Sequence, residues 1–267
     1  MLVGVADETC YNCGRRNPAL WGFAPALRAL GGDLGFAPFV IGTCIIVYTL
    51  TLIFSGGIGG MNRDLLSPAP EALFLFGASG WRPVFIGGRW WTVLSAGWLH
   101  GGALHIFMNM MAVRQLAPGV AELYGAGRAV IIYTAGSIVG FGLSSVAGAF
   151  IPPIFFLRGA SFTVGASAPI AGLIGAVLAY SHQTGSTTAR FYARYYIIGL
   201  LLIGFFFPVV DNYAHLGGLA GGYVVARVFN PLKAERVDHM LLGVVCIGLS
   251  LLSIVVSVFH GARFLRP

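Results

Sequence analysis

Long apolar stretches alternate with short polar segments along this chain. Seven of the stretches are long enough to cross a bilayer as helices, because about 20 helical residues span its hydrocarbon core. They cover residues 37–58, 98–116, 128–150, 164–181, 194–210, 213–229 and 240–259. The pattern predicts an all-α membrane protein, folded as a polytopic bundle of helices.

The polar segments divide the chain into three predicted parts. Residues 1–36 mix polar residues with Pro and Gly and are expected to form a cytoplasmic tail. This tail does not resemble a cleavable signal peptide, so we expect the first helix to remain as an anchor. Residues 37–230 are expected to form a six-helix core, and residues 231–267 a linker and a seventh helix. The connection at 59–97 is too polar to span a membrane but is rich in Trp, which predicts a loop in the headgroup region.

Composition excludes an ordinary soluble domain, because 57% of the residues are apolar and only 9% are charged. The formal charge of +7 is therefore interpreted as contact between cytoplasmic loops and anionic lipid, not as nucleic-acid binding. Every basic residue except Lys233 is Arg, which is typical of a GC-rich bacterial genome. We expect a multi-pass protein of the bacterial inner membrane, which is the plasma membrane, with the lipid bilayer as one partner.

The basic residues also predict the orientation. With the N-terminus in the cytoplasm and seven helices, ten basic residues lie inside and six outside, as the positive-inside rule favours. The inner set is Arg15, Arg16, Arg28, Arg114, Arg128, Arg190, Arg194, Arg227, Lys233 and Arg236, and the outer set is Arg63, Arg82, Arg89, Arg158, Arg263 and Arg266. The C-terminus is then external.

The four cysteines do not predict a disulfide framework. Cys44 and Cys246 lie in apolar stretches, while Cys10 and Cys13 form one C-x-x-C that resembles half of a zinc ribbon. Structural zinc takes four ligands, and the sequence has neither a second C-x-x-C nor a His nearby. We therefore expect no metal and no cofactor, and interpret the pair as surface thiols or as a site shared between two chains.

Ser167 is the first candidate for chemistry. It lies near the start of the fourth predicted helix among Gly165, Ala166 and Ala168, and small neighbours leave a nucleophilic hydroxyl accessible. The same stretch of small residues is also typical of close packing between membrane helices. The motif alone therefore leaves both interpretations open.

Two other helices carry polar groups. In the second, His105 and Asn109 are four residues apart and share a face, while His100 is nearer the outer end and rotated away. In the sixth, His215 precedes Gly218 and Gly222, which form a small-xxx-small face. Polar side chains inside a membrane are costly, so they indicate function or hydrogen bonds between helices.

Topology brings these groups together. The second, fourth and sixth helices run in the same direction, and each carries its polar groups in its first turns. Ser167, His215, His105 and Asn109 should therefore lie at one depth near the external face. A serine beside a histidine supplies a nucleophile and a general base, and the other side chains supply donors for an oxyanion.

At this point the sequence resembles the rhomboid intramembrane serine proteases. The resemblance covers about residues 89–229 and rests on three motifs in order: H-x-x-x-x-H-x-x-x-N at His100, His105 and Asn109; G-x-S-x at Gly165–Ala168; and A-H-x-x-G-x-x-x-G at Ala214–Gly222. It implies a rhomboid-like six-helix core plus one C-terminal helix, the 6+1 arrangement. It also implies a dyad of Ser167 and His215 that cleaves transmembrane substrates near the external face. From their positions on the second helix we expect His105 and Asn109 to support the oxyanion, and His100 chiefly to anchor the outer loop.

The chain departs from the family pattern at two positions. Ala168 follows the serine where the family usually has Gly, and we expect access to survive. Thr92 follows Trp91 where the family has Arg, so Arg89 is the candidate substitute in the loop. Asp211, four residues before His215, is expected to be solvated and not to form a triad.

Three functions remain for comparison. The first is a serine endopeptidase acting on single-pass or other transmembrane proteins. The second is a catalytically inactive rhomboid-like protein that binds membrane helices, although such relatives typically lack the Ser or His that this chain keeps. The third is a transporter, which internal repeats and acidic residues within the predicted helices would favour, and neither is found. We therefore predict the endopeptidase, with no nucleic-acid partner.

Overall fold

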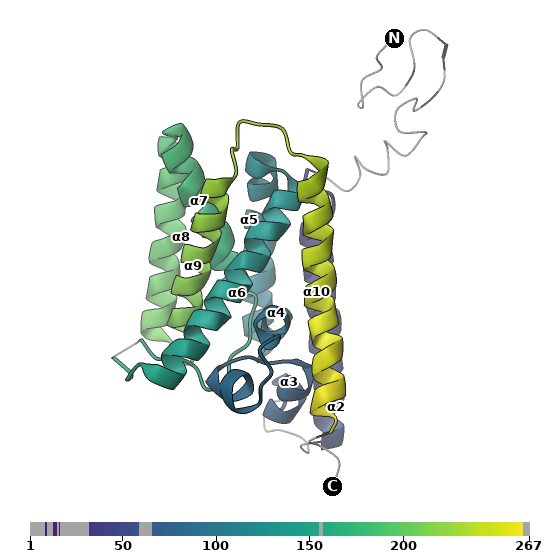
Figure 1. The fold of residues 1–267 in the computed structure, drawn as a ribbon, viewed down its shortest axis with the longest axis vertical. Helices are drawn as coiled ribbons and strands as arrows, with labels where there is room; N and C mark the ends of the chain where they lie inside the picture. Colours follow the sequence, from purple (N-terminus) through teal and green to yellow (C-terminus); the bar gives the residue numbers. More distant parts are fainter. Residues whose placement is uncertain are drawn as a thin grey trace.

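The computed structural model describes residues 32–58, 66–154 and 157–263, together with Thr9, Cys13, Gly14 and Arg16. Within these residues the regular elements are helices, and seven of the helices are long (Figure 1). They are α2 (Phe36–Ile58), α5 (Ala103–Tyr124), α6 (Ala126–Phe150), α7 (Ser167–Thr184), α8 (Thr187–Phe206), α9 (Asn212–Val228) and α10 (Val237–Gly261). The predicted all-α bundle is confirmed.

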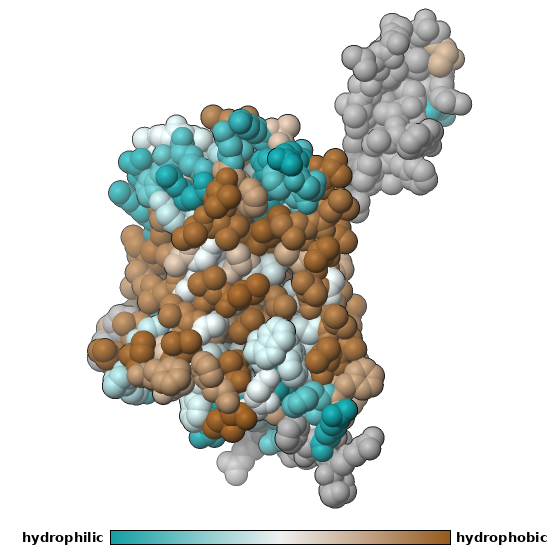
Figure 2. All heavy atoms as spheres, in the orientation of Figure 1, coloured by the Kyte–Doolittle hydropathy of each residue, from teal (hydrophilic) through white to brown (hydrophobic). Residues whose placement is uncertain are grey.

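The bundle is built for a membrane. By length and composition α2, α6, α8 and α10 are able to cross one. Figure 2 shows a broad hydrophobic band on this face of the molecule, with hydrophilic residues gathered at both ends. The other long helices, α5, α7 and α9, carry the candidate residues His105, Asn109, Ser167 and His215, and most residues of α7 are buried. The chain is therefore a multi-pass helical membrane protein with its polar groups inside.

Glycine lets α7 and α9 approach closely. A Cβ atom built on Gly218 would lie 2.1 Å from the carbonyl oxygen of Ala168, and one built on Gly222 would lie 2.1 Å from that of Gly172. Such distances are far shorter than any van der Waals contact, so any side chain at either position would push the helices apart. The predicted small-xxx-small face of α9 is thus the surface that packs on α7.

Two helices begin later than predicted, because glycine interrupts the helical backbone. The second helix, α5, begins at Ala103 instead of residue 98, since Gly102 is extended with φ 174° and ψ 166°. Likewise α7 begins at Ser167 instead of residue 164, since Gly165 has φ +137°, which other residues rarely adopt. Ser167 therefore opens its helix.

Two helices extend beyond their predicted ranges, one at its end and the other at its start. Instead of ending at residue 116, α5 continues past Pro118 to Tyr124. The fifth helix, α8, begins at Thr187 and not at residue 194, with the Ser186 hydroxyl accepting the Ala189 N–H at 3.2 Å as an N-cap. Polar residues at the membrane surface, including Arg190, thus belong to the helix and not to the loop before it.

The connection between α2 and α5 is folded into short helices. They are α3 (Pro70–Phe76), the π-helical η2 (Arg82–Ile86), α4 (Thr92–Ser95) and the 3-10 turn η3 (Ala96–Trp98). Of these, α3 and α4 pack against α10. The expected headgroup-region loop is therefore an ordered layer that covers one end of the bundle.

The start of α10 is held by a buried arginine, Arg128 in the first turn of α6, which contacts the linker before α10. The Arg128 guanidinium donates four hydrogen bonds of 3.0–3.2 Å to backbone carbonyls, namely those of Tyr124, Asn230, Lys233 and Ala234. The Glu235 carboxylate accepts the backbone N–H groups of Gly127 and Arg128 at 3.2 and 2.7 Å. Because these N–H groups open α6, the linker both caps α6 and fixes the start of α10.

The other end of α10 is fastened by Arg89, which is fully buried. Its guanidinium donates to the carbonyl oxygens of Phe74 at 2.8 Å and Ser257 at 3.0 Å, and the Trp91 indole N–H donates to the Ser257 hydroxyl at 3.0 Å. Burial lowers the pKa of Arg89 to about 10, so the group keeps its charge at neutral pH. Arg89 therefore joins α3 to α10, while its equivalence to the arginine missing at Thr92 stays a prediction.

Candidate active site

Ser167 lies at the positive end of a helix. The first N–H groups of α7 have no carbonyl partner within the helix, and Pro169 has no N–H to satisfy. The preceding Gly165 donates its N–H to the carbonyl oxygen of Ala96 at 2.9 Å, which fixes the turn. Ser167 itself is only partly buried. Its hydroxyl is thus held beside unpaired backbone donors in a partly accessible position.

The segment before Ser167 is held by the layer of short helices. Ser79 and Thr163 exchange two backbone hydrogen bonds of 3.0 and 2.8 Å, and the Trp81 N–H donates to the carbonyl oxygen of Ala160 at 3.0 Å. Sequence reasoning missed this contact, since nothing in either loop marks its partner. The first connection therefore positions the chain that leads into Ser167.

His215 lies in the first turn of α9 and is buried. Asp211 caps this helix, since its Oδ1 accepts the Ala214 N–H at 3.0 Å and its Oδ2 accepts the Ser144 hydroxyl at 2.5 Å. Burial raises the pKa of Asp211, an effect that these hydrogen bonds partly oppose. The prediction that Asp211 is solvated was therefore wrong, because its carboxylate accepts hydrogen bonds from Ser144 in α6 and from Ala214 in α9.

Asp211 also does not orient the imidazole of His215. The Nδ1 atom of His215 is buried and has no hydrogen-bond partner among the residues that the structure describes. Both carboxylate oxygens of Asp211 are engaged elsewhere, as given above. The arrangement therefore agrees with the expectation that no triad forms.

The turns that carry Ser167 and His215 meet on α6. Ala168, which follows the serine, and Ala214, which precedes the histidine, belong to one buried cluster with Ala96 and Phe141. A Cβ atom built on Gly140 would lie 2.9 Å from the Cβ of Ala168 and 2.6 Å from the carbonyl oxygen of Ala214. Since the Ala168 methyl group packs into this cluster, it is not available to cover the Ser167 hydroxyl.

His105 reaches the same place from α5. A Cβ atom on Gly165 would lie 2.6 Å from Nε2 of His105 and 3.6 Å from Oγ of Ser167, so only a glycine leaves room for the imidazole. His105 and His215 are close enough to interact electrostatically. Asn109, one turn further along α5, is buried. His105 on α5 thus lies near both the serine turn of α7 and His215 on α9, and the convergence of all four polar groups stays a prediction.

His100 is placed differently from the prediction. It was expected to be rotated away on the helix, but it precedes α5 because Gly101 and Gly102 interrupt the helix there. The imidazole is fully buried, its ring centroid lies 5.2 Å from that of His105, and its Nε2 accepts the Ala166 N–H at 3.5 Å. The histidine therefore contacts the residue next to Ser167 through a long hydrogen bond.

A small cavity of about 70 Å³ borders His215. It lies between α8 and α9, and its other walls are mostly apolar, with Ile197 and Leu201 from α8 and Leu216 from α9. A larger cavity, described below, lies at the opposite end of α7 and α9.

The part of the chain that the structure describes contains no group of three His, Cys, Asp or Glu side chains able to hold a metal. Cys13 is exposed, and Cys10 lies outside the described residues. The interpretation of the C-x-x-C as surface thiols or a shared site therefore stays a prediction.

Fold and site together define a polytopic helical membrane protein with a partly accessible serine near buried histidine and asparagine side chains. The sequence matches the Rhomboid domain family over residues 87–231, more than half of the chain. The chain belongs to the rhomboid family.

Three relatives illustrate the range of this family. RHOMBOID-like protein 6, mitochondrial, of Arabidopsis thaliana is 33% identical over 171 residues, which are 62% of this chain and 52% of the relative. Rhomboid protease GluP of Bacillus subtilis (strain 168) is 32% identical over 178 residues, 66% of this chain and 33% of GluP. Inactive RHOMBOID-like protein 8 of Arabidopsis thaliana is 26% identical over 161 residues, 59% of this chain and 43% of the relative. The chain thus spans about a third to a half of these relatives.

Proposed function

We propose that this protein is an intramembrane serine endopeptidase in which Ser167 is the nucleophile and His215 the general base. The observation that carries the proposal is the meeting of the Ser167 and His215 turns on Gly140, with His105 directed at Gly165 beside the serine. The similarity to Rhomboid protease GluP supports it. A packing role alone does not require an accessible serine at this point.

The reaction follows from these groups. The Ser167 Oγ attacks the carbonyl carbon of the scissile peptide bond while its proton passes to His215, and the imidazolium then gives that proton to the leaving amine. Water next attacks the acyl group on Ser167 and gives a proton to His215, which returns it to the serine oxygen. With Asp211 committed to Ser144 and Ala214, the proton transfers involve a dyad.

The oxyanion of each tetrahedral intermediate has three sources of stabilisation. The unpaired N–H groups and the dipole of α7 point toward the position of Ser167, where the charge develops. His105 and Asn109 supply side-chain donors from α5. His100 supports the Ala166 amide next to the serine. The charge therefore forms among fixed dipoles and needs little rearrangement.

The proposed substrates are transmembrane helices. Peptide bonds within a helix are shielded, so a substrate must unwind locally to reach Ser167. The predicted orientation puts the site near the external face of the membrane, and the use of Arg for every basic residue except Lys233 favours a bacterial inner membrane. The substrate partner is then a single-pass or other transmembrane protein.

The test is labelling of the purified protein with a fluorophosphonate, together with cleavage of a model transmembrane substrate. We expect the wild type to be labelled once, and Ser167→Ala and His215→Ala each to lose cleavage while remaining folded. The double variant should be no less active than either single one, because the residues act as a unit. Undiminished cleavage by Ser167→Ala would end the proposal.

A second candidate function is a catalytically inactive protein that binds membrane helices. The similarity to Inactive RHOMBOID-like protein 8 is the observation that favours it. The same experiment distinguishes the two, because an inactive protein would show neither labelling nor cleavage while still retaining the helix in detergent.

A further inference from the structure

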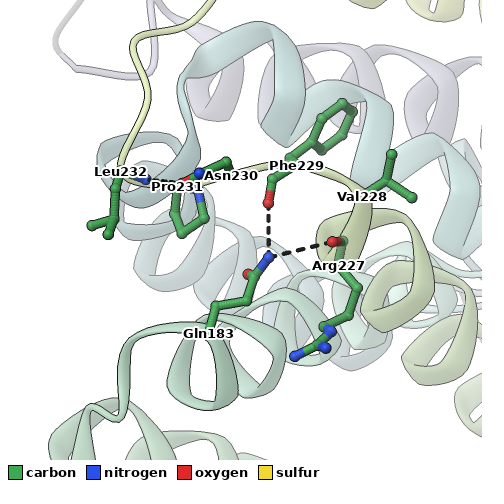
Figure 3. Close-up of a pocket in the computed structure, with 7 residues that line it drawn as sticks. All are labelled: Gln183, Arg227, Val228, Phe229, Asn230, Pro231 and Leu232. Atoms are coloured by element: carbon green, nitrogen blue, oxygen red, sulfur yellow. Dashed lines mark hydrogen bonds between the residues drawn. The ribbon is translucent and has the colours of Figure 1, made fainter.

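A cavity lies far from Ser167, at the opposite end of α7 and α9. Its volume is about 360 Å³, and its walls come from the last turn of α7, the end of α9 and the start of the linker. Figure 3 shows Gln183 of α7 facing Arg227 and Phe229, with Asn230 and Leu232 beyond them. The site proposed for catalysis makes no use of this region.

The Gln183 side chain, which forms one wall, has hydrogen bonds at both the oxygen and the nitrogen of its amide group. Its Oε1 accepts the Tyr124 hydroxyl at 3.0 Å, and its Nε2 donates to the carbonyl oxygens of Phe229 at 2.8 Å and Arg227 at 3.4 Å. The carbonyl oxygens at the end of α9 are thereby occupied, as is that of Asn230, which accepts from Arg128 at 3.2 Å. A ligand in the cavity would therefore meet the Arg227 guanidinium and the Asn230 amide more readily than backbone oxygens.

The positive charge of Arg227 is not offset locally. Glu235 is occupied by the N–H groups that open α6, and Asp238 pairs with Arg236 at 2.7 Å. Among the described residues Arg227 enters no salt bridge. Lys233 and Arg190 add positive charge at the same end of the bundle. The cavity is thus a polar site with a cation at its wall and an excess of positive charge around it, which suits an anion.

The rim of the cavity is apolar and exposed. Val228 on α9 is 79% exposed, Leu232 in the linker is 78% exposed, and Val224 one turn back along α9 is 61% exposed. Exposed aliphatic side chains along a membrane helix are covered by acyl chains. A cation beside such a strip matches an amphiphile with an anionic head better than it matches a free anion.

We propose that this cavity binds the phosphate headgroup of an anionic phospholipid, held by Arg227 and Asn230, with an acyl chain lying along Val224 and Val228. The predicted orientation places the site in the cytoplasmic leaflet, where anionic lipid attracts basic residues. The shared chemistry, a phosphate ester, would also be offered by a soluble phosphate compound. Arg227 could also act only on the dipole at the C-terminus of α9.

The test uses the full chain in a mild detergent and measures its thermal midpoint against added phosphatidylglycerol, phosphatidylcholine or glycerol phosphate. We expect phosphatidylglycerol to raise the midpoint, as a ligand of the folded state does, and the other two to leave it unchanged. In Arg227→Gln the apparent affinity should fall about fivefold or more, since one basic residue near a membrane surface contributes about that factor. Arg194→Gln, which removes the same charge from the exposed face of α8, is the matched control and should bind like the wild type.

A second variant covers the case in which Arg227→Gln does not fold. Asn230→Asp keeps the side-chain oxygen that accepts the Leu232 N–H at 2.9 Å, but adds a negative charge at the cavity. We expect it to fold and to lose the response to phosphatidylglycerol. Equal loss in Arg194→Gln would mean general surface charge, and an equal response to glycerol phosphate would mean a soluble ligand. A thermal midpoint of Arg227→Gln that is lowered in every condition, with the response to phosphatidylglycerol intact, would mean that Arg227 acts only on the helix dipole. Each of these three results overturns the proposal.

Discussion

At the residue scale, His105, His100 and Asn109 each stand in a different relation to the turn that carries Ser167. His105 is directed at Gly165, His100 accepts the Ala166 amide, and Asn109 is buried one turn below His105. His100 is therefore better described as a support of the serine loop than as an anchor of the outer loop. These positions separate the expected effects of substitution.

We expect Asn109→Ala to lower turnover about 10²–10³-fold, because one oxyanion donor typically contributes that much. His105→Ala should cause a similar or smaller loss. Both variants should still react with a fluorophosphonate, since the nucleophile and base remain. His100→Ala should lower both the thermal midpoint and turnover, through the lost contact with Ala166. Wild-type turnover in Asn109→Ala alongside an inactive but stable His100→Ala would reverse these roles.

Asp211 gives a test of dyad against triad. Asp211→Asn keeps an oxygen for the Ala214 N–H, so the cap of α9 should survive and cleavage should stay within about tenfold of wild type. A triad carboxylate replaced by Asn typically costs about 10⁴ in turnover. Asp211→Ala removes the cap and should lower the free energy of unfolding by about 1 kcal/mol. Steady-state cleavage and thermal unfolding of the two variants distinguish these effects.

Sequence reasoning could propose Ser167, His215, His105 and Asn109 as candidates because local pattern and helix direction are both visible in the sequence. It could not place His100, whose position depends on a helix interrupted at Gly101 and Gly102. It also missed the partner of Arg89, since Ser257 is 168 residues away and the bond is to a backbone oxygen. Contacts to backbone atoms leave no complementary side chain in the sequence from which to infer them.

At the scale of elements, the distance between α7 and α9 is set by glycine. The helices were predicted correctly in number and order, but their starts moved wherever glycine changed the backbone, as at Gly102 and Gly165. Hydrophobic pattern locates the middle of a membrane helix, while its ends depend on capping and loop contacts. The close approach of α7 and α9 is what brings the start of α7, at Ala168, against Gly218 in α9.

Gly218→Ala should therefore impair catalysis without touching a reacting group. Its Cβ would lie 2.1 Å from the Ala168 carbonyl oxygen, so the backbones must separate, at a cost of about 1–3 kcal/mol. We expect a lower thermal midpoint and a loss of cleavage. Gly248→Ala on α10 is the matched control, because no atom lies within 4 Å of the added methyl group. Equal behaviour of the two variants would contradict the packing argument.

At the scale of the whole molecule, the direction of the helices determines where the chain ends. The first residue of α2, Phe36, packs near the start of α6, where its ring centroid lies 5.4 Å from that of Tyr133. The linker that leads into α10 caps this same end of α6. In Figure 1 α10 runs from that end to the layer formed by α3 and α4. The first and last long helices, α2 and α10, therefore run in the same direction.

We expect a reporter fused after Pro267 to face the exterior and a reporter at the N-terminus to face the cytoplasm. The reason is the excess of basic residues at the end where the linker lies. Alkaline phosphatase, which is active outside, and a fluorescent protein that matures only inside provide the measurement. Both ends on one side would contradict the assignment of seven spans.

The two arginines that fasten α10 have a consequence for any shortened form of this protein. A chain cut back to the six-helix core would leave the charge of Arg89 buried without its carbonyl partner on α10 and would remove two of the four carbonyl oxygens around Arg128, those of Lys233 and Ala234. It would also uncap α6, the helix on which the Ser167 and His215 turns meet. The seventh helix comes last in the sequence, but it and its linker hold both Arg89 and the start of α6 in place. The minimal unit for any functional comparison is therefore the chain with α10 in place.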